Sequence, residues 1–147
     1  MSMLSPSCSR APAAWIGMLR VHERLLHELD AELERTHGLS LAEYDVLSQL
    51  EAAADRRMRM ADLAEAVLLT RSGMSRLVDR LEARGLVERS RCPSDARGLN
   101  ASLTDAGAAL LSEASVTHLA GVRERFTDRL GPDDVARLES IWEQLGA

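Results

Sequence analysis

Residues 63–107 read LAEAVLLTRSGMSRLVDRLEARGLVERSRCPSDARGLNASLTDAG, and the order of elements in this stretch decides the fold. The apolar residues of 61–67 share one helical face, and Thr70 is a suitable N-cap for a second helix over 71–84. In that second helix the apolar residues recur at i, i+3, i+4 and i+7: Met74, Leu77, Val78 and Leu81. Two short helices joined by a turn of a few residues are typical of a helix-turn-helix.

A two-stranded hairpin is predicted directly after the second helix. Gly85 suits a left-handed helix end, and residues 86–89 and 100–103 are predicted strands. The polar segment SRCPSDARG at 90–98 lies between them and contains the proline and glycine of a turn. A helix-turn-helix followed by a hairpin is a winged helix-turn-helix, which is a DNA-binding architecture.

Longer helices are predicted on both sides of this lobe. Residues 13–37 form an amphipathic helix with its apolar stripe at Ile16, Leu19, Leu26, Leu29 and Leu33. The polar segment 1–12 is expected to be a flexible tail. Gly38 ends the helix, and the capping box Ser40-Leu-Ala-Glu43 opens the next one, whose apolar face holds Tyr44, Leu47 and Leu50.

The remaining elements complete one domain over residues 1–147. A very short strand is predicted at 58–60, Thr104 caps a helix over 105–129, and Pro132 opens a last helix that ends near Leu145. The predicted fold class is mainly α with a small β-hairpin wing. A winged helix-turn-helix lobe at 40–104 is flanked by the helices of 13–37 and 105–147.

Charge is unevenly distributed along the chain. Its net charge is -5, yet residues 56–97 hold ten arginines and six acidic residues, a balance of +4, which leaves -9 for the remainder. A basic middle between acidic ends is expected if only the middle binds a polyanion such as DNA. A solvated arginine face is the alternative interpretation of the same charges.

Several other classes of protein are disfavoured by the sequence. No apolar run approaches the roughly 20 residues that span a bilayer, and the first residues lack the pattern of a signal peptide, so we expect a cytoplasmic protein. Cys8 and Cys92 are far apart and form no CxxC pair, and the four histidines form no metal-binding pair. We predict no metal, no cofactor and no enzymatic activity, because a nucleophile elbow and a glycine-rich phosphate loop are both lacking.

The second helix of the helix-turn-helix carries the predicted contacts with DNA. Its apolar residues are committed to the core, so Ser72, Gly73, Ser75, Arg76, Asp79 and Arg80 face outward. Serine hydroxyls bind phosphates or base edges, a glycine permits close approach of the backbone, and an arginine binds guanine or phosphate bidentately. The free N–H groups at the helix N-terminus add to the attraction for phosphate.

These residues resemble the MarR family of bacterial transcriptional regulators. The resemblance is carried by SGMSRLVDRLEARGLVER at 72–89, by Asp95-Ala-Arg97 and by Leu103-Thr-Asp-Ala-Gly107, and the helix order extends it over nearly the whole chain from about Ala13. It implies a homodimer in which the helices of 13–37 and 105–147 form the dimerisation base. Phe126 and Trp142 belong on these helices, and packing in the core of one chain is the alternative interpretation of both residues. The resemblance also implies a repressor that leaves its operator in response to a small-molecule or stress signal.

The resemblance also assigns the wing. It places the second helix in a major groove of a pseudo-palindromic operator and the wing in the adjacent minor groove. Arg97 matches the arginine that enters the minor groove, and Asp95 matches the acid that holds this arginine. The complete predicted DNA-binding set is Ser72, Gly73, Ser75, Arg76, Arg80, Arg91, Asp95 and Arg97. Alternatively, Arg97 is a solvated partner of Asp95, and Arg80 and Arg84 only neutralise acids such as Asp79 and Glu88.

An effector site is predicted between the base and the lobe. Trp15, His22 and Tyr44 are candidates to line a crevice where many members of the family hold small aromatic or phenolic effectors. Core packing explains Trp15 and Tyr44 equally well. His22 and Glu23 are also candidates for a metal or effector site, although a satisfied histidine is the favoured interpretation.

Two other functions compete with DNA binding. A thiol-based redox sensor or redox protein would use Cys92, whose neighbour Arg91 favours the thiolate, but no second thiol or base lies near it in sequence. Cys8 lies in the expected tail. A winged-helix module that binds only proteins is the third possibility, and it would show no salt-sensitive affinity for DNA.

Overall fold

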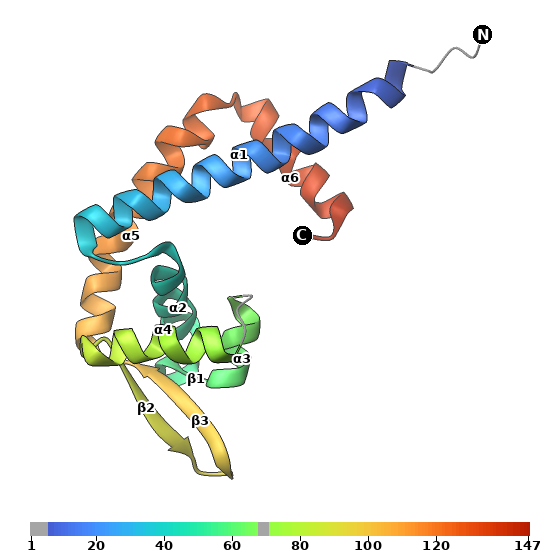
Figure 1. The fold of residues 1–147 in the computed structure, drawn as a ribbon. Helices are drawn as coiled ribbons and strands as arrows, with labels where there is room; N and C mark the ends of the chain where they lie inside the picture. The colour runs from blue at the N-terminus through green and yellow to red at the C-terminus, as the bar shows by residue number, and fades with distance from the viewer. Residues whose placement is uncertain (1–5, 68–70) are drawn as a thin grey trace.

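The computed structural model describes residues 6–67 and 71–147, and it places a small lobe at one end of a long helical base (Figure 1). The elements in chain order are α1 (Pro6–His37), α2 (Leu41–Ala52), the 3-10 turn η1 (Ala54–Arg56), β1 (Arg57–Arg59), α3 (Met60–Ala66), α4 (Arg71–Ala83), β2 (Val87–Cys92), β3 (Asp95–Leu103), α5 (Asp105–Arg125), the 3-10 turn η2 (Thr127–Arg129) and α6 (Pro132–Leu145). The predicted fold class, mainly α with a small hairpin wing, is therefore confirmed.

The lobe encloses one hydrophobic core. The apolar faces of α2, α3 and α4 meet there with the ends of the wing strands, and the fully buried side chains include Leu47, Leu50, Leu63, Met74, Val78, Leu81 and Val87. The sheet is antiparallel in the order β1-β3-β2, with Arg57 opposite Ser102 and Val87 opposite Leu103. The helical period that the sequence shows in 71–84 thus marks a buried face.

Two predicted caps join the elements of the lobe. The Ser40 Oγ accepts the Glu43 N–H at 3.1 Å and a Glu43 carboxylate oxygen accepts the Ser40 N–H at 3.0 Å, so the capping box is formed. The Thr104 Oγ1 accepts the Gly107 N–H at 3.0 Å and donates to the Gly85 carbonyl at 2.7 Å. Thr70, the third predicted cap, lies outside the described residues.

Gly107 lets the start of α5 pack directly on the backbone of Leu86, just before β2. A Cβ atom at this position would lie 2.1 Å from the carbonyl oxygen of Leu86, which is far inside van der Waals contact. Any side chain here would therefore push the start of α5 away from the segment between α4 and β2. This contact gives a physical reason for the glycine that ends the sequence LTDAG.

Some element boundaries differ from those predicted. The helix α1 begins at Pro6 rather than Ala13, so residues 6–12, which include Cys8, belong to it; Pro12 stays inside the helix and merely lacks one backbone N–H donor. The helix α5 ends at Arg125 rather than Arg129, because Phe126 adopts φ -128° and ψ -71° and the chain continues as η2. The strand β1 begins at Arg57, one residue before the predicted position.

The base is formed by α1, α5 and α6. The helix α1 packs along α5. The helix α6 crosses the N-terminal half of α1 in Figure 1, and residues of both helices line one cavity. At the α1–α5 contact, the Arg125 Nη1 lies 2.6 Å from a Glu32 carboxylate oxygen. None of the helices in residues 6–67 and 71–147 is long and apolar enough to cross a membrane.

Candidate nucleic-acid interface

The helix α4 divides its residues between the core and the surface as predicted. Met74, Leu77, Val78 and Leu81 are buried, while Ser72 and Arg76 are exposed and Gly73 and Ser75 are half-buried. Within the described part of the chain, no hydrogen bond or ion pair occupies the guanidinium of Arg76. This side chain is therefore available to a ligand outside the lobe.

The other arginines in and near α4 are held by protein groups. The Arg80 Nε donates to a Glu43 oxygen at 3.1 Å, and the Arg84 Nη1 donates to the Gly38 carbonyl at 2.7 Å. Arg89 pairs with Asp79 and Glu82; hydrogen bonding to Asp79 and then to Glu82 raises the pKa of its guanidinium. The alternative that these arginines only neutralise protein acids therefore fits Arg80, although its partner is Glu43 and not Asp79 or Glu88. It does not fit Arg84, which binds backbone carbonyl groups.

The wing presents Arg97 on a bulge. Arg91 pairs with Leu99 but the next residue, Cys92, pairs with Asp95, so residues 96–98 of β3 have no counterpart on β2. The Arg97 N–H donates to the Asp95 Oδ1 at 3.0 Å, which closes the bulge. Asp95 therefore fixes the backbone of Arg97, whereas the resemblance implied a contact with its side chain.

The exposed cations of the wing point to a surface for anions. Arg91 and Arg97 are both exposed, and in residues 6–67 and 71–147 their guanidinium groups make no ion pair. Arg97 lies in the bulge and Arg91 lies beside it on β2, and the wing extends from the same lobe that carries α4 (Figure 1). The arrangement suits the polyanionic backbone of a nucleic acid.

Cys92 packs against the bulge and is buried there. Its side chain is only 8% exposed, its Sγ lies 3.3 Å from the Ser94 Oγ, and a Cβ at Gly98 would lie 3.2 Å from the Cys92 Cβ. The pKa of the thiol is lowered, first by the hydrogen bonds from Ser94 and then by the charge of Arg59. A lowered pKa favours the thiolate, but a reactive thiol also needs access, which this packing restricts. The redox interpretation is not favoured.

Arg59 is a wing residue that the sequence interpretation missed. It lies on β1, and its Nη2 donates to the Ser94 Oγ at 3.2 Å, 35 positions further along the chain. Its neighbour on the same strand face, Arg57, donates to the Ser102 Oγ at 3.1 Å. The alternation Arg57-Met-Arg59 was the available signal, since residues i and i+2 of a strand share one face.

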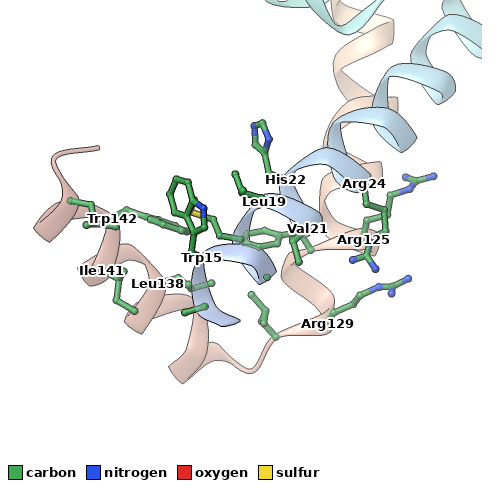
Figure 2. Close-up of a pocket in the computed structure, with 16 residues that line it drawn as sticks. Trp15, Leu19, Val21, His22, Arg24, Arg125, Arg129, Leu138, Ile141 and Trp142 are labelled. Atoms are coloured by element: carbon green, nitrogen blue, oxygen red, sulfur yellow. The ribbon is translucent and has the colours of Figure 1, made fainter. Parts of the chain in front are cut away.

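The three predicted effector residues do not come together. Trp15 and His22 line an apolar cavity of about 960 Å³ between α1, η2 and α6, and the predicted dimerisation residues Phe126 and Trp142 line it too (Figure 2). Tyr44 is absent from that lining. Trp15 is 60% exposed, so core packing within the chain does not explain it, whereas core packing does explain the buried Tyr44.

Tyr44 belongs instead to a polar contact between α2 and α5. Its hydroxyl donates to the Ser115 Oγ at 3.3 Å, and its ring lies 4.6 Å from that of His118. Burial lowers the pKa of His118, which the charge of Asp45 partly opposes, and burial raises the pKa of Asp45. Among the described residues, no group of three His, Cys, Asp or Glu side chains lies close enough together to hold a metal ion. His22 and Glu23 therefore belong to no such group.

Comparison with known proteins agrees with this geometry. The MarR family model matches residues 37–98. The chain is 31% identical over 132 residues to the HTH-type transcriptional regulator MhqR of Bacillus subtilis, covering 90% of this chain and 88% of that protein.

Two solved structures from Streptomyces coelicolor are similar over almost the whole chain. AbsC, a MarR family transcriptional regulator, superposes with a TM-score of 0.85 at 34% identity and covers 99% of this chain and 95% of its own. Sco3205, a MarR family regulator solved in complex with DNA, gives 0.88 at 34% identity, with coverage of 99% and 89%. The chain therefore belongs to the MarR family and is a winged-helix transcriptional regulator.

Proposed function

We propose that the chain is a homodimeric repressor that binds a pseudo-palindromic operator through α4 and the wing. In this proposal α4 enters the major groove, and Arg97 enters the adjacent minor groove. The two half-sites lie about one helical turn, or ~34 Å, apart. A small-molecule or stress signal releases the protein from its operator by favouring a different spacing of the two α4 helices of the dimer. Our candidate for this signal is a small aromatic or phenolic effector.

The observation that carries DNA binding is the contrast among the arginines of the lobe. Arg80, Arg84 and Arg89 are engaged by protein groups, whereas the exposed guanidinium groups of Arg76, Arg91 and Arg97 make no ion pair in the part of the chain that the structure describes. The unpaired cations occupy α4 and the wing, the two elements with which a winged helix-turn-helix contacts DNA. Negative net charge elsewhere orients this surface toward the polyanion.

The dimer is supported by the apolar surface of the base. A single chain leaves these large hydrophobic residues of α1, α5 and α6 exposed: Trp15, Ile16, Met18, Leu19, Val21, Leu26, Val116, Leu119, Ile141, Trp142 and Leu145. Exposed hydrophobic side chains in this number on three neighbouring helices are typical of a protein–protein interface. A second copy is the partner that a two-fold dimer provides, because both copies present the same surface.

The proposal is tested with arginine variants and an operator selected from a random duplex library by the parent protein. Arg76→Ala removes a bidentate base or phosphate contact worth about 1–3 kcal/mol, so we expect affinity to fall by roughly 5- to 150-fold, with changed sequence preference. Arg97→Ala is expected to weaken binding by about tenfold while the thermal stability stays unchanged.

The matched control is Arg137→Ala, which removes an exposed cation from α6 and should leave affinity unchanged. Fluorescence anisotropy at several salt concentrations measures the affinities, and the parent's affinity should fall steeply as salt rises. Variants that bind like the parent would refute the assigned contacts. A parent protein without measurable affinity for any duplex would instead favour the protein-interaction module.

A further inference from the structure

Two arginine side chains attach α4 to the junction between α1 and α2: Arg80 in its C-terminal half and Arg84 directly after its end at Ala83. The Arg84 Nη1 donates to the Gly38 carbonyl at 2.7 Å, and its Nη2 lies 3.5 Å from the His37 carbonyl. One turn earlier, the Arg80 Nε lies 3.1 Å from a Glu43 carboxylate oxygen. The end of α4, which we call the recognition helix, is thus joined directly to the end of α1. The two acceptors, Gly38 and His37, precede Arg84 by 46 and 47 positions in the chain.

The acceptors of Arg84 have an electrostatic reason to bind a cation. The last carbonyl groups of a helix have no intrahelical partners and carry the negative end of the helix dipole. Here α1 ends at His37, and Gly38 follows in the left-handed conformation with φ 64°. The guanidinium of Arg84 donates to the carbonyl of Gly38, just beyond the helix, and its Nη2 lies 3.5 Å from the last helical carbonyl, that of His37.

The acceptor of Arg80 is held in a fixed position. Glu43 is only 6% exposed, and its carboxylate already accepts the Ser40 N–H of the capping box. The adjacent Leu41 N–H donates to the Asp30 Oδ1 at 2.7 Å, so the start of α2 is fastened to α1. Arg80 therefore pairs with a carboxylate whose position is fixed relative to both α1 and α2.

The same junction is also tied to α5. The His37 Nε2 lies 2.7 Å from the Thr117 Oγ1, which joins the end of α1 to the middle of α5. Leu39, in the loop between α1 and α2, is fully buried in the core that also contains Leu77 and Leu81 of α4. The junction is thus a point at which the base and the recognition helix meet.

We propose that Arg84, assisted by Arg80, is a positioning residue that transmits the orientation of α1 to the recognition helix. The inference rests on the proposed homodimeric DNA binding, because only in a dimer does the orientation of α4 on the base determine the distance between two recognition helices. Loss of the Arg84 contact frees α4 to take a wider range of orientations. The dimer then discriminates less between operators whose half-sites are differently spaced.

The spacing of the recognition helices is measured by double electron-electron resonance in full-length protein. Spin labels are attached at Arg76→Cys in a background with Cys8→Ser and Cys92→Ser, with and without Arg84→Ala. We expect the distance distribution between the two labels to broaden in Arg84→Ala and to return toward the parent's in Arg84→Lys, which can still donate to the Gly38 carbonyl. Equal distributions in the parent and Arg84→Ala would overturn the inference.

An operator series separates positioning from a direct phosphate contact. Affinities of unlabelled parent and Arg84→Ala are measured for the selected operator and for duplexes with one base pair inserted between the half-sites. The insertion should weaken the parent by about tenfold or more and Arg84→Ala by about threefold or less. If Arg84→Ala lowers the affinity for both duplexes by the same factor, Arg84 contacts a phosphate. If Arg84→Ala lowers the Tm but still discriminates between the duplexes like the parent, its role is only structural. Either result contradicts the inference.

The control variant is Arg123→Ala, which removes an exposed cation from α5 and should retain the parent's discrimination. Failure of the proposed function gives a different result from failure of this inference. A parent that sediments as a monomer and shows no distance between labels contradicts the dimer itself, whatever Arg84→Ala does.

Discussion

The lobe and the base use the same kind of apolar helical pattern, but only the lobe completes its core within one chain. In α4 the apolar residues Met74, Val78 and Leu81 are fully buried, whereas in α6 Trp142 remains 37% exposed and Leu145 71% exposed. No residue of α6 is buried. Helical periodicity therefore identifies an apolar face that must be buried, but it does not indicate whether the same chain or a second chain buries it.

The largest expected effect is on the free energy of unfolding, which should respond to truncation of a leucine in the lobe but not in the base. Leu81→Ala creates a cavity in the core of the lobe and should lower the free energy of unfolding by about 2–5 kcal/mol. The matched variant Leu145→Ala removes the same atoms from the proposed dimer surface of the base, so it should weaken association but change the free energy of unfolding of the lobe by less than about 0.5 kcal/mol. Urea denaturation followed by circular dichroism measures both, and similar losses would contradict the contrast between lobe and base.

The next effect concerns the base. Trp142→Ser removes a large aromatic side chain from the proposed dimer interface, where such residues contribute about 2 kcal/mol or more, so the dimer Kd should rise by roughly 30-fold. Sedimentation equilibrium at several concentrations measures the change. Circular dichroism should show a folded lobe at the same time. An unaltered association state would mean that α6 lies outside the interface.

The smallest effect lies where the lobe meets the base, at His118. Because burial lowers the pKa of His118 in the folded protein, the unfolded chain takes up a proton more readily as pH falls. This contribution to stability is therefore complete above about pH 6.5 and is lost as pH falls toward the lower, folded pKa. Asp45, whose pKa is raised, acts with the opposite sign at more acidic pH.

Urea denaturation across about pH 7 to 5.5 tests this linkage. His118→Gln should flatten the dependence of stability on pH, while His27→Gln, at an exposed position, should keep the parent's slope. A slope that survives His118→Gln would assign the dependence to another group.

Much of the fold could be predicted because local signals carried it. The capping box at Ser40 and Glu43, the Thr104 cap and the period of α4 each depend on residues a few positions apart, and the structure contains all three. The start of α1 was predicted seven residues late, because Pro12 was interpreted as a boundary although a helix continues through it.

The site could be predicted only in part, because its remaining features depend on contacts between distant residues. The bulge that presents Arg97 follows from the pairing of Arg91 with Leu99, which composition does not encode. The partner of Arg84 lies 46 positions away, at Gly38. Tyr44 and Trp15 were grouped by chemistry, but one lies in the core of the lobe and the other on the open surface of the base.

The most direct test of the account is the mass of the complex with the selected operator, measured by native mass spectrometry. A dimeric DNA-binding protein should place two chains of 16.1 kDa on each duplex, and the complex should be lost when Arg76→Ala and Arg97→Ala are combined. One chain per duplex, or a complex that survives the double variant, would contradict it.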